Sequence, residues 1–496
     1  MWIRQCELDA AREEHPPIPS RIASNEEFIP PPQSPQQQEY EARLMALSAE
    51  TARRRGMDRR SFLRSASGMA AALLALNQVF GDCYQVEAAE LVEEAAFTEK
   101  WPKDQFIFDV QTHHVDLRRH WYDASADGRF IHRLFHVLAP TRTLQEDLEQ
   151  WNRIQYVKEV FGDSDTVMAV ISGVPTRDWS KNPLPPDLMA ATRQYVNDLA
   201  GSQRVLSQGL LRPNLGRKEL DEMERQAKEL KVDAWKCYPG AELDAEAWRL
   251  DDEKVAYPFW DKTQKLGITN ICVHKGLPLS VLNTKGCRPD DVEKAAKDWP
   301  GLNFILYHSA FRGFGAHDRH KGRDAAEPPD RDDPQYIPWV SDVLQMLRQN
   351  PTITNVYCEL GATFHQTSMF APVMCMHMLA QMMQVAGADH ILWGTDSVWG
   401  GGPQSQIVRM RQLRIHDQLI ERYAYPQLTD EVKAQIFGLN AAKLFGVDPQ
   451  AKRREIRADK LTAWREQVGD ELAPSNTQFG WVWEGGRRRP TTPVGG

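Results

Sequence analysis

Between Asp104 and Val447, short apolar runs alternate with longer charged segments, and this alternation restricts the possible folds more than any other feature of the chain. The intervening segments, such as Asp221–Lys231 and Asp290–Asp298, read as amphipathic helices. Eight strands separated by helices are what a (β/α)8 barrel requires. The eight runs are Phe106–Val110, Val167–Val174, Val205–Leu211, Val232–Cys237, Thr269–Val273, Asn303–Tyr307, Thr354–Leu360 and His390–Trp393. The pattern therefore predicts an α/β fold, a TIM barrel over residues 104–447, with a doubly wound open sheet as the alternative.

Composition excludes some classes of protein. Of the 496 residues, 42% are hydrophobic and 26% are charged, which is ordinary for a globular protein. The formal net charge of −8 provides no basic excess, so we expect no nucleic-acid partner. The seven cysteines include no C-x-x-C pair, and three of them (Cys237, Cys272 and Cys358) lie in apolar runs, so we interpret them as core residues and expect no disulfide framework.

Four of the apolar runs end in residues that bind metals. Gln111 and His113 point to the same side of the first run, because alternate residues of a strand share a face. His274, His308 and Asp396 follow three later runs. A single histidine at a strand end is more often structural, but the carboxyl ends of barrel strands converge on one site. This set is typical of a catalytic zinc or manganese site in which the metal activates water or polarises a substrate oxygen.

The order of these motifs is similar to that of the amidohydrolase superfamily. Asp109-Val110-Gln111-Thr112-His113 resembles the strand-one D-x-H-x-H motif. His274, His308 and Gly394-Thr395-Asp396 resemble the motifs of strands five, six and eight, and Gly438-Leu439-Asn440-Ala441 resembles the terminal helix. The most similar branch is the amidohydrolase-related group that includes aminocarboxymuconate-semialdehyde decarboxylase. The resemblance implies that His113, His274 and Asp396 hold one divalent metal, with Asp396 also contacting the bound water, and that His308 is the catalytic base or polarises the substrate or water.

Position 111 departs from the family pattern, which commonly has histidine there. Glutamine offers only a neutral carbonyl oxygen, a poorer ligand for a transition metal than imidazole. Three interpretations remain open: Gln111 is a weak fourth ligand, the metal has three ligands, or metal binding has been lost.

Three basic residues near the predicted strand ends are candidates for substrate binding: Lys236, Arg212 and Lys275. We expect Lys236 to line the mouth of the barrel and to pair with a substrate carboxylate or a neighbouring acid. A strand-four lysine is carboxylated in some two-metal members of the superfamily, but the altered strand-one motif argues against a second metal. The alternative for each residue is a structural salt bridge across the mouth.

The two ends of the chain fall outside the barrel pattern. Residues 1–56 are polar and proline-rich, which predicts disorder. Residues 57–90 contain Arg59-Arg60-Ser61-Phe62-Leu63 and a short apolar run, which is the form of a twin-arginine signal beginning at Met57. We expect the protein to be exported to the periplasm, or to stay in the cytoplasm if the signal is not used. We expect no stable transmembrane anchor. The alternative for this segment is a short surface or docking helix. We expect residues 448–496 to form an extension, and the sequence leaves open whether it packs on a neighbouring subunit.

These observations favour a metal-dependent hydrolase in which activated water attacks the amide, ester or lactone carbonyl of a small molecule. A non-oxidative decarboxylase of a small aromatic or unsaturated acid is the first alternative, because it would use the same ligands. A metal-free ligand-binding barrel is the second alternative, because of Gln111. The segment Phe314–Pro338 predicts a long loop that could cover the mouth, and the family resemblance suggests a homodimer.

Overall fold

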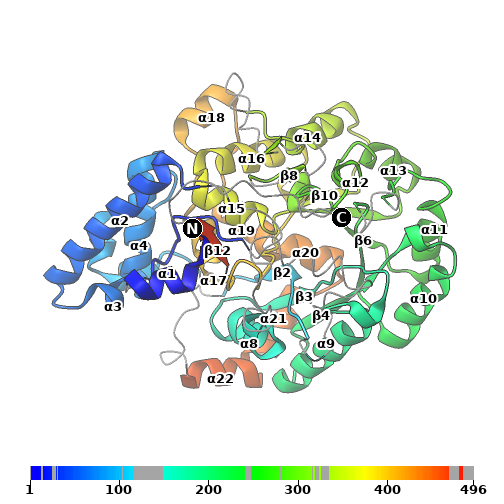
Figure 1. The fold of residues 1–496 in the computed structure, drawn as a ribbon, viewed down its shortest axis with the longest axis horizontal. Coiled ribbons are helices and arrows are strands. Elements are labelled where there is room, and N and C mark those ends of the chain that lie inside the picture. The colour runs from blue at the N-terminus through cyan, green and yellow to red at the C-terminus, as the bar shows by residue number, and fades with distance from the viewer. Residues whose placement is uncertain are drawn as a thin grey trace.

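The eight predicted runs form one parallel sheet (Figure 1). The computed structural model describes residues 2–12, 15–24, 30, 32–102, 104–116, 118, 149–240, 247–278, 282–314, 317–318, 323–324, 335–468 and 480–483. The strands are β2 (Phe108–Thr112), β3 (Met168–Ile171), β4 (Val205–Leu210), β5 (Ala234–Cys237), β6 (Asn270–His274), β7 (Asn303–Tyr307), β10 (Val356–Glu359) and β11 (Ile391–Leu392). Each of them pairs in parallel with the next along the chain.

The two edge strands of this sheet, β2 and β11, also approach each other. The backbone N–H of Val110 donates to the carbonyl of Trp393 at 3.0 Å, and Thr112 forms a parallel bridge with Ser397. The sheet is therefore a nearly closed barrel, which confirms the predicted TIM barrel and excludes the doubly wound alternative.

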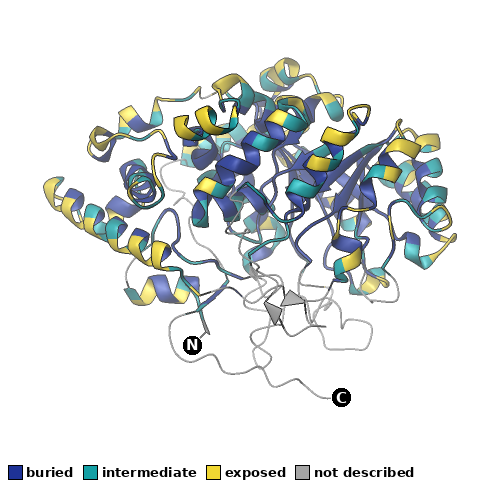
Figure 2. Cartoon of the chain, turned by 90° about the horizontal axis from the view of Figure 1, so that it is seen from above, coloured by how far each residue is buried: buried dark blue, intermediate teal, exposed yellow. Residues whose placement is uncertain are grey.

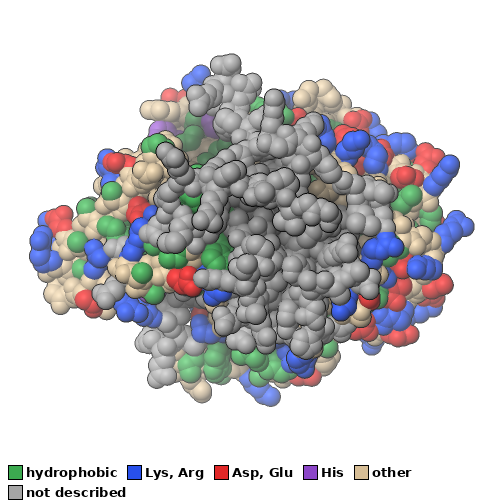
Figure 3. All heavy atoms as spheres, viewed as in Figure 1, with side chains coloured by type: hydrophobic (Ala, Val, Ile, Leu, Met, Phe, Trp, Pro, Cys, Tyr) green, Lys and Arg blue, Asp and Glu red, His purple; other side chains and the backbone are tan. Residues whose placement is uncertain are grey.

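Helices surround the barrel and bury their apolar faces against it, while their outer faces are exposed (Figure 2). The predicted helix Asp221–Lys231 is found as α10 followed by a wider turn over Gln226–Leu230, and it ends where Lys231 adopts a left-handed conformation. These helices are α8 (Arg153–Val157), α9 (Pro186–Ala200), α10 (Glu219–Arg225), α11 (Tyr257–Leu266), α12 (Thr284–Cys287), α13 (Val292–Asp298), α14 (Val340–Gln349), α15 (Thr363–Phe370), α16 (Pro372–Val385), α17 (Gln404–Gln412), α18 (Asp417–Tyr423), α19 (Asp430–Ala434) and α20 (Asn440–Leu444). On the face shown in Figure 3, basic and acidic side chains are interspersed along the outer rim.

The barrel interior is filled by apolar side chains. A polar layer lies between them and the residues at the carboxyl ends of the strands. Side chains such as Phe108, Val170 and Ile305 form the apolar filling. Above it, the hydroxyl of Tyr307 accepts a hydrogen bond from Gln208 Nε2 at 2.6 Å and donates to the carbonyl of Val110 at 2.5 Å. This layer separates the packed core from the residues at the carboxyl ends of the strands.

The closing helix is joined to the base of the barrel by the motif that resembled the family's terminal helix. The side chain of Asn440 donates to the carbonyls of Ala388 and Ile391, both at 2.8 Å. A Cβ on Gly438 would collide with the carbonyl oxygen of Phe106, so only glycine allows this close approach.

The predicted disorder of residues 1–56 is wrong for two segments. Gln5–Arg12 forms α1, and Pro35–Arg54 forms the 20-residue helix α2, which begins with a capping box at Ser34. Tyr40 and Leu44 lie one turn apart on the buried face of α2, and Tyr40 donates to the carbonyl of Ile18 at 2.6 Å. The polar composition of this segment concealed an apolar stripe that is stabilised only by packing on another helix.

The twin-arginine-like segment is folded into the molecule. Arg59–Leu63 is α3 and Ala66–Phe80 is α4, which packs against α2 at one side of the barrel (Figure 1). The apolar side chains of α4 belong to the same buried cluster as the outer face of the barrel strands. Beyond α4, two short helical segments, Ala88–Leu91 and α5 (Glu94–Thr98), precede the barrel. Within the described part of the chain, no helix combines the length and apolarity needed to cross a membrane.

The C-terminal extension packs on its own chain. After α21 (Pro449–Arg457) and α22 (Lys460–Val468), strand β12 (Trp481–Trp483) pairs antiparallel with β1 (Trp2–Arg4). The described part of the extension thus joins the two ends of the molecule. The predicted loop over Phe314–Pro338 lies largely outside the described residues. Two short parts of it are described, β8 (His317–Asp318) and β9 (Arg323–Asp324), and they pair antiparallel with each other.

Candidate active site

The carboxyl end of the barrel brings together the residues that the motifs identified. Gln111 and His113 lie at the end of β2, His274 ends β6, and His308 directly follows β7. Asp396 follows β11, and its backbone N–H donates to the carbonyl of Gln111 at 3.0 Å. Gln111 and the three histidines are buried, whereas the Asp396 side chain retains 17% exposure. The site is therefore a buried cluster with the carboxylate at its accessible side.

His113 and Asp396 form the first pair in the cluster. The Nε2 of His113 lies 2.9 Å from Oδ1 of Asp396. The other ring nitrogen, Nδ1, lies 2.8 Å from the carbonyl oxygen of Ser172, which can only accept, so Nδ1 carries a proton. In the neutral tautomer that this contact selects, Nε2 presents a lone pair beside the carboxylate. A histidine oriented in this way by a backbone carbonyl is the usual form of a metal ligand.

His274 and His308 form the second pair. Nε2 of His274 donates to the carbonyl of Leu277 at 3.0 Å, and Nδ1 of His308 donates to the carbonyl of Gly361 at 2.9 Å. The two remaining nitrogens lie 3.1 Å apart. In the neutral rings both are acceptors, so this contact requires a shared proton or a cation. Burial lowers the pKa of His274 well below its ordinary value and that of His308 to about 4, which disfavours the shared proton.

Gln111 is oriented as a hydrogen-bond donor towards the first pair. Its Nε2 donates to Oδ1 of Asp396 at 2.8 Å and lies 3.4 Å from Nε2 of His113. Its amide oxygen is buried and has no hydrogen-bond partner among the described residues. A buried amide oxygen without a donor is costly, and this one marks an incomplete interaction within the site.

Both catalytic candidates have left-handed backbones. His308 has a φ of 67° and Asp396 a φ of 60°, a region that favours glycine. Hydrogen bonds hold the first turn in place: Thr363 Oγ1 donates to the carbonyl of His308 at 2.8 Å, and the N–H of His308 donates to Oε2 of Glu359 at 3.0 Å. Such strained residues persist where the surrounding structure determines their conformation, as in functional sites.

Asp109 holds the turn that carries Asp396 in place through hydrogen bonds. Its carboxylate accepts hydrogen bonds from the N–H groups of Gln111 and Thr395, both at 3.1 Å, and from the hydroxyl of Thr395. Burial raises the pKa of Asp109 to about 7, although these hydrogen bonds favour the charged form. The first aspartate of the strand-one motif therefore joins β2 to the turn after β11 and does not itself reach the site.

Lys236 lies inside the barrel beneath the histidines. Its side chain is fully buried, and Nζ has no hydrogen-bond partner among the described residues. Nζ lies 3.5 Å from the centre of the Tyr307 ring and 5.2 Å from that of Tyr238. Burial lowers the pKa of Lys236 to about 8. Tyr238 in turn stacks on His274, with ring centres 4.4 Å apart.

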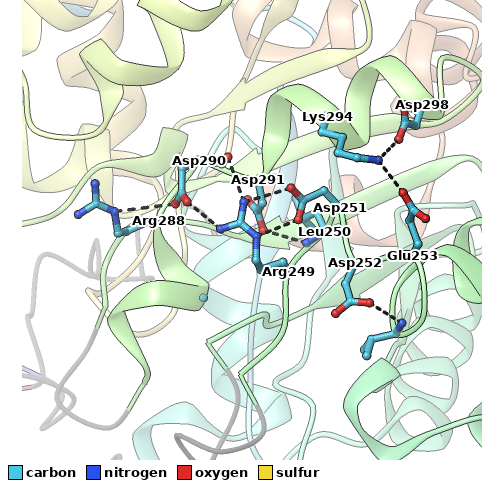
Figure 4. A network of polar contacts seen from close by, with 12 residues as sticks. Arg249, Leu250, Asp251, Asp252, Glu253, Arg288, Asp290, Asp291, Lys294 and Asp298 are labelled. Atoms are coloured by element: carbon cyan, nitrogen blue, oxygen red, sulfur yellow. Dashed lines mark hydrogen bonds and ion pairs between the residues drawn. The ribbon is translucent and has the colours of Figure 1, made fainter.

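The other two basic candidates for substrate binding, Lys275 and Arg212, form salt bridges, as the alternative prediction for them has it, and their role in substrate binding stays a prediction. Lys275 is fully buried and donates to the carbonyls of Gly286 and Arg288 and to Asp291. Asp291 also accepts from the N–H of Leu250, in the polar network of the outer loops shown in Figure 4. Arg212 binds Glu219 at 2.7 Å and stacks over the Trp179 ring at 3.5 Å. Each of the two cations is thus paired with an acidic residue of the same chain. This pairing is the structural salt bridge that the sequence left open as the alternative.

The donor set fits a divalent metal when glutamine is counted with the other ligands. Among the described residues, no group of three or more His, Cys, Asp or Glu side chains is assembled to hold a metal ion. The first pair gains its third member from Gln111, whose amide lies 2.8 Å from Asp396 and 3.4 Å from His113. Ligands bound at about 2.1 Å to one ion are about 3.0 to 3.4 Å apart at octahedral to tetrahedral angles. The triangle of Gln111 Nε2, His113 Nε2 and Asp396 Oδ1 has edges of 3.4, 2.9 and 2.8 Å, which is close to these dimensions.

Comparison with known proteins agrees with the motifs and the barrel. The amidohydrolase family profile matches residues 185–447, more than half of the chain. The chain belongs to the amidohydrolase family. It is therefore an enzyme of a family whose barrel carries its chemistry at the carboxyl ends of the strands. The match begins after His113, so the strand-one motif with Gln111 lies outside it.

Among solved structures the chain resembles several barrels. An uncharacterised TIM-barrel protein of Bordetella bronchiseptica is 15% identical, with a TM-score of 0.43, covering 70% of this chain and 99% of that one. A manganese-containing 5-carboxyvanillate decarboxylase of Novosphingobium aromaticivorans is 14% identical (TM-score 0.39, 70% and 97% covered). A putative 2-pyrone-4,6-dicarboxylic acid hydrolase of Pseudomonas putida is 13% identical (TM-score 0.41, 69% and 98% covered). A search of curated proteins found no match.

Proposed function

We propose that this amidohydrolase is a metal-dependent hydrolase of a small molecule with an amide, ester or lactone bond. The observation that carries the proposal is two pairs of acceptor atoms at the carboxyl end of the barrel, His113 with Asp396 and His274 with His308, with the Gln111 amide beside the first pair. Such a set of acceptors in a buried site is suited to a cation. Zinc is the first candidate and manganese the second.

The residues of the site have distinct tasks in this proposal. His113, His274 and Asp396 hold the metal, together with Gln111. When bound, the metal supplies Lewis acidity and lowers the pKa of water. Asp396 is the only one of these side chains with appreciable exposure, so it is placed to accept a proton from the attacking water. His308 exposes only Nε2 to the site, because Nδ1 donates to Gly361, so Nε2 is the atom that transfers a proton to or from the substrate.

A second candidate is a metal-dependent, non-oxidative decarboxylase of a small aromatic or unsaturated acid. The observation in its favour is Lys236, a buried cation without a hydrogen-bonding acceptor among the described residues. A carboxylate substrate would provide that acceptor, and the ammonium would then orient it. A hydrolase of acidic substrates could use the same contact, so the test has to detect both reactions.

Metal content is the first test. Protein purified without added metal is analysed by inductively coupled plasma mass spectrometry, with His274→Ala as the control. About one equivalent of zinc or manganese, lost in the variant, would support the proposal. The protein is then screened against amides, lactones and hydroxybenzoates, and release of carbon dioxide would identify the decarboxylase. No metal after soaking in both ions would overturn both reactions and support a metal-free ligand-binding barrel.

Two further properties are part of the proposal. Export through the twin-arginine pathway is supported by Arg59-Arg60 and the apolar run that follows, whereas the packing of the same residues as α3 and α4 supports the alternative of a docking helix; fractionation of the producing cell distinguishes the two. A homodimer is suggested by the family resemblance, and light scattering of the purified protein would test it.

A further inference from the structure

We infer that Gln111 binds the metal through its amide oxygen and that Glu359 makes this possible by accepting the amide N–H. The inference rests on the proposed metal-dependent function. It assigns Glu359, on β10, a positioning role that none of the sequence motifs indicates.

Glu359 is held in place by hydrogen bonds from the backbone. Its side chain is fully buried, and its oxygens accept hydrogen bonds from the N–H of Gly361 at 2.7 Å and from that of His308 at 3.0 Å. A carboxylate oxygen can accept a second hydrogen bond. Glu359 is therefore fixed in place by the backbone and retains capacity for a further donor.

Glu359 and Gln111 share the space that two glycines leave open. A Cβ built on Gly361 would collide with the amide oxygen of Gln111 and stand 2.7 Å from Oε1 of Glu359. A Cβ on Gly394 would collide with the same Oε1 and stand 3.2 Å from Cβ of Gln111. Two glycines thus leave room for these two side chains beside each other. The unpartnered amide oxygen and Oε1 of Glu359 therefore lie within about 5 Å of each other, and an ionised Glu359 offers the amide oxygen no donor.

The Gln111 amide has a second orientation, related to the first by a half-turn. Rotation about the terminal C–C bond of Gln111 exchanges its nitrogen and oxygen with little movement of either position. The nitrogen would then face Oε1 of Glu359, which can accept its N–H. The oxygen would take the position that lies 2.8 Å from Oδ1 of Asp396 and 3.4 Å from Nε2 of His113. Three acceptors would then surround one point, an arrangement that a cation stabilises.

Glu359 therefore selects between two states of the site. Without metal, the amide donates to Asp396 and leaves its own oxygen without a donor. With metal, the amide donates to Glu359 and its oxygen completes the ligand triangle. A partner that orients a ligand in this way typically changes metal affinity by about 10- to 100-fold.

A double-mutant cycle on metal affinity tests the inference. The dissociation constants of zinc and manganese are measured by competition with a chelator for the full-length wild type, Gln111→Leu, Gln111→Glu, Glu359→Gln and the double variant Gln111→Glu/Glu359→Gln. Glu90→Gln, the same change at a buried glutamate outside the barrel, is the control. Circular dichroism and thermal melting verify that each variant is folded.

We expect Gln111→Leu to weaken metal binding by about 10- to 100-fold. Gln111→Glu places a carboxylate against Glu359, so we expect no gain in affinity in the wild-type background. In the Glu359→Gln background, the same change should strengthen binding, with a coupling of at least about tenfold. Glu90→Gln should bind as the wild type does.

The opposite outcomes separate this inference from the proposed function. If the wild type binds metal and Gln111→Leu binds it equally well, Gln111 is not a ligand. If Gln111→Glu has the same effect in both backgrounds, Glu359 does not act on the amide. Either result would overturn the inference and leave the metal-dependent function intact. A wild type that binds neither ion would overturn both.

Discussion

Each histidine of the site has one ring nitrogen bound to a backbone carbonyl. The acceptors are Ser172 for His113, Leu277 for His274 and Gly361 for His308. These contacts determine the tautomer, and they leave the other nitrogen of each ring directed into the site. At the scale of single residues, the backbone therefore determines which atoms are available for chemistry.

His308 provides the first prediction at this scale. Replacing it with alanine removes the proton-transfer group and should lower kcat by about 10²- to 10⁴-fold on any substrate that the wild type turns over. The matched control is His114→Gln, because His114 points away from the site and contacts the hydroxyl of Thr192 at 3.0 Å. Steady-state kinetics on both variants checks the prediction. Equal losses in the two variants would indicate a structural cause instead.

Lys236 provides the second prediction, which concerns stability and pH. Burial lowers its pKa from 10.5 to about 8, so below pH 8 the folded protein carries a cation that is better solvated in the unfolded chain. The resulting cost is on the order of 3 kcal/mol and disappears as the pH rises from about 8 to 10.5, where the unfolded chain loses its proton. We expect Lys236→Met to raise the free energy of unfolding at pH 7 and to have less effect at pH 10.

Urea denaturation of metal-free protein at the two pH values measures this difference. A variant that is destabilised equally at pH 7 and pH 10 would show that packing, not charge, is the contribution of Lys236.

At the scale of elements, the N-terminal helices behave as part of the enzyme core. The segment after α4 adds a strand-like contact to the barrel, since the N–H of Gln85 donates to the carbonyl of Gln412 at 2.8 Å and that of Arg414 donates to Cys83 at 3.0 Å. The hydroxyl of Tyr84 also donates to the carbonyl of Ser368 in α15. Helix α4 is therefore attached to the barrel at its C-terminal end as well as along its buried face.

The prediction at this scale is that α4 contributes to global stability. Leu76 is fully buried, so Leu76→Ala should lower the free energy of unfolding by about 2 to 5 kcal/mol. Val92→Ala, at a side chain that is 54% exposed, should change it by less than about 0.5 kcal/mol. Denaturant titrations of both variants check this. An unchanged stability of Leu76→Ala would instead indicate that α4 is a separable leader.

At the scale of the whole molecule, the metal should stabilise the fold, because it would join ligands from strands that are distant in sequence. At a free metal concentration 100 times the dissociation constant, binding contributes about 2.7 kcal/mol. We therefore expect a chelator to lower the melting temperature of the wild type and zinc to restore it. His113→Ala should melt at the same temperature with and without chelator. If the melting temperature of the wild type does not change with chelator, the predicted stabilisation by metal is wrong.

The barrel and the convergence of its candidate site residues could be predicted from the sequence alone. Strand runs and helical segments are local patterns, and the carboxyl ends of parallel barrel strands must converge, so His113, His274, His308 and Asp396 could be placed at one site without coordinates. The groups that these residues contact could not be predicted in this way, because they depend on how the chain packs. The packing of α2 on α4, the burial of Lys275 against Asp291 and the place of Glu359 beside Gln111 depend on contacts between distant segments. Local propensity does not encode such contacts, since they form only when the whole chain packs.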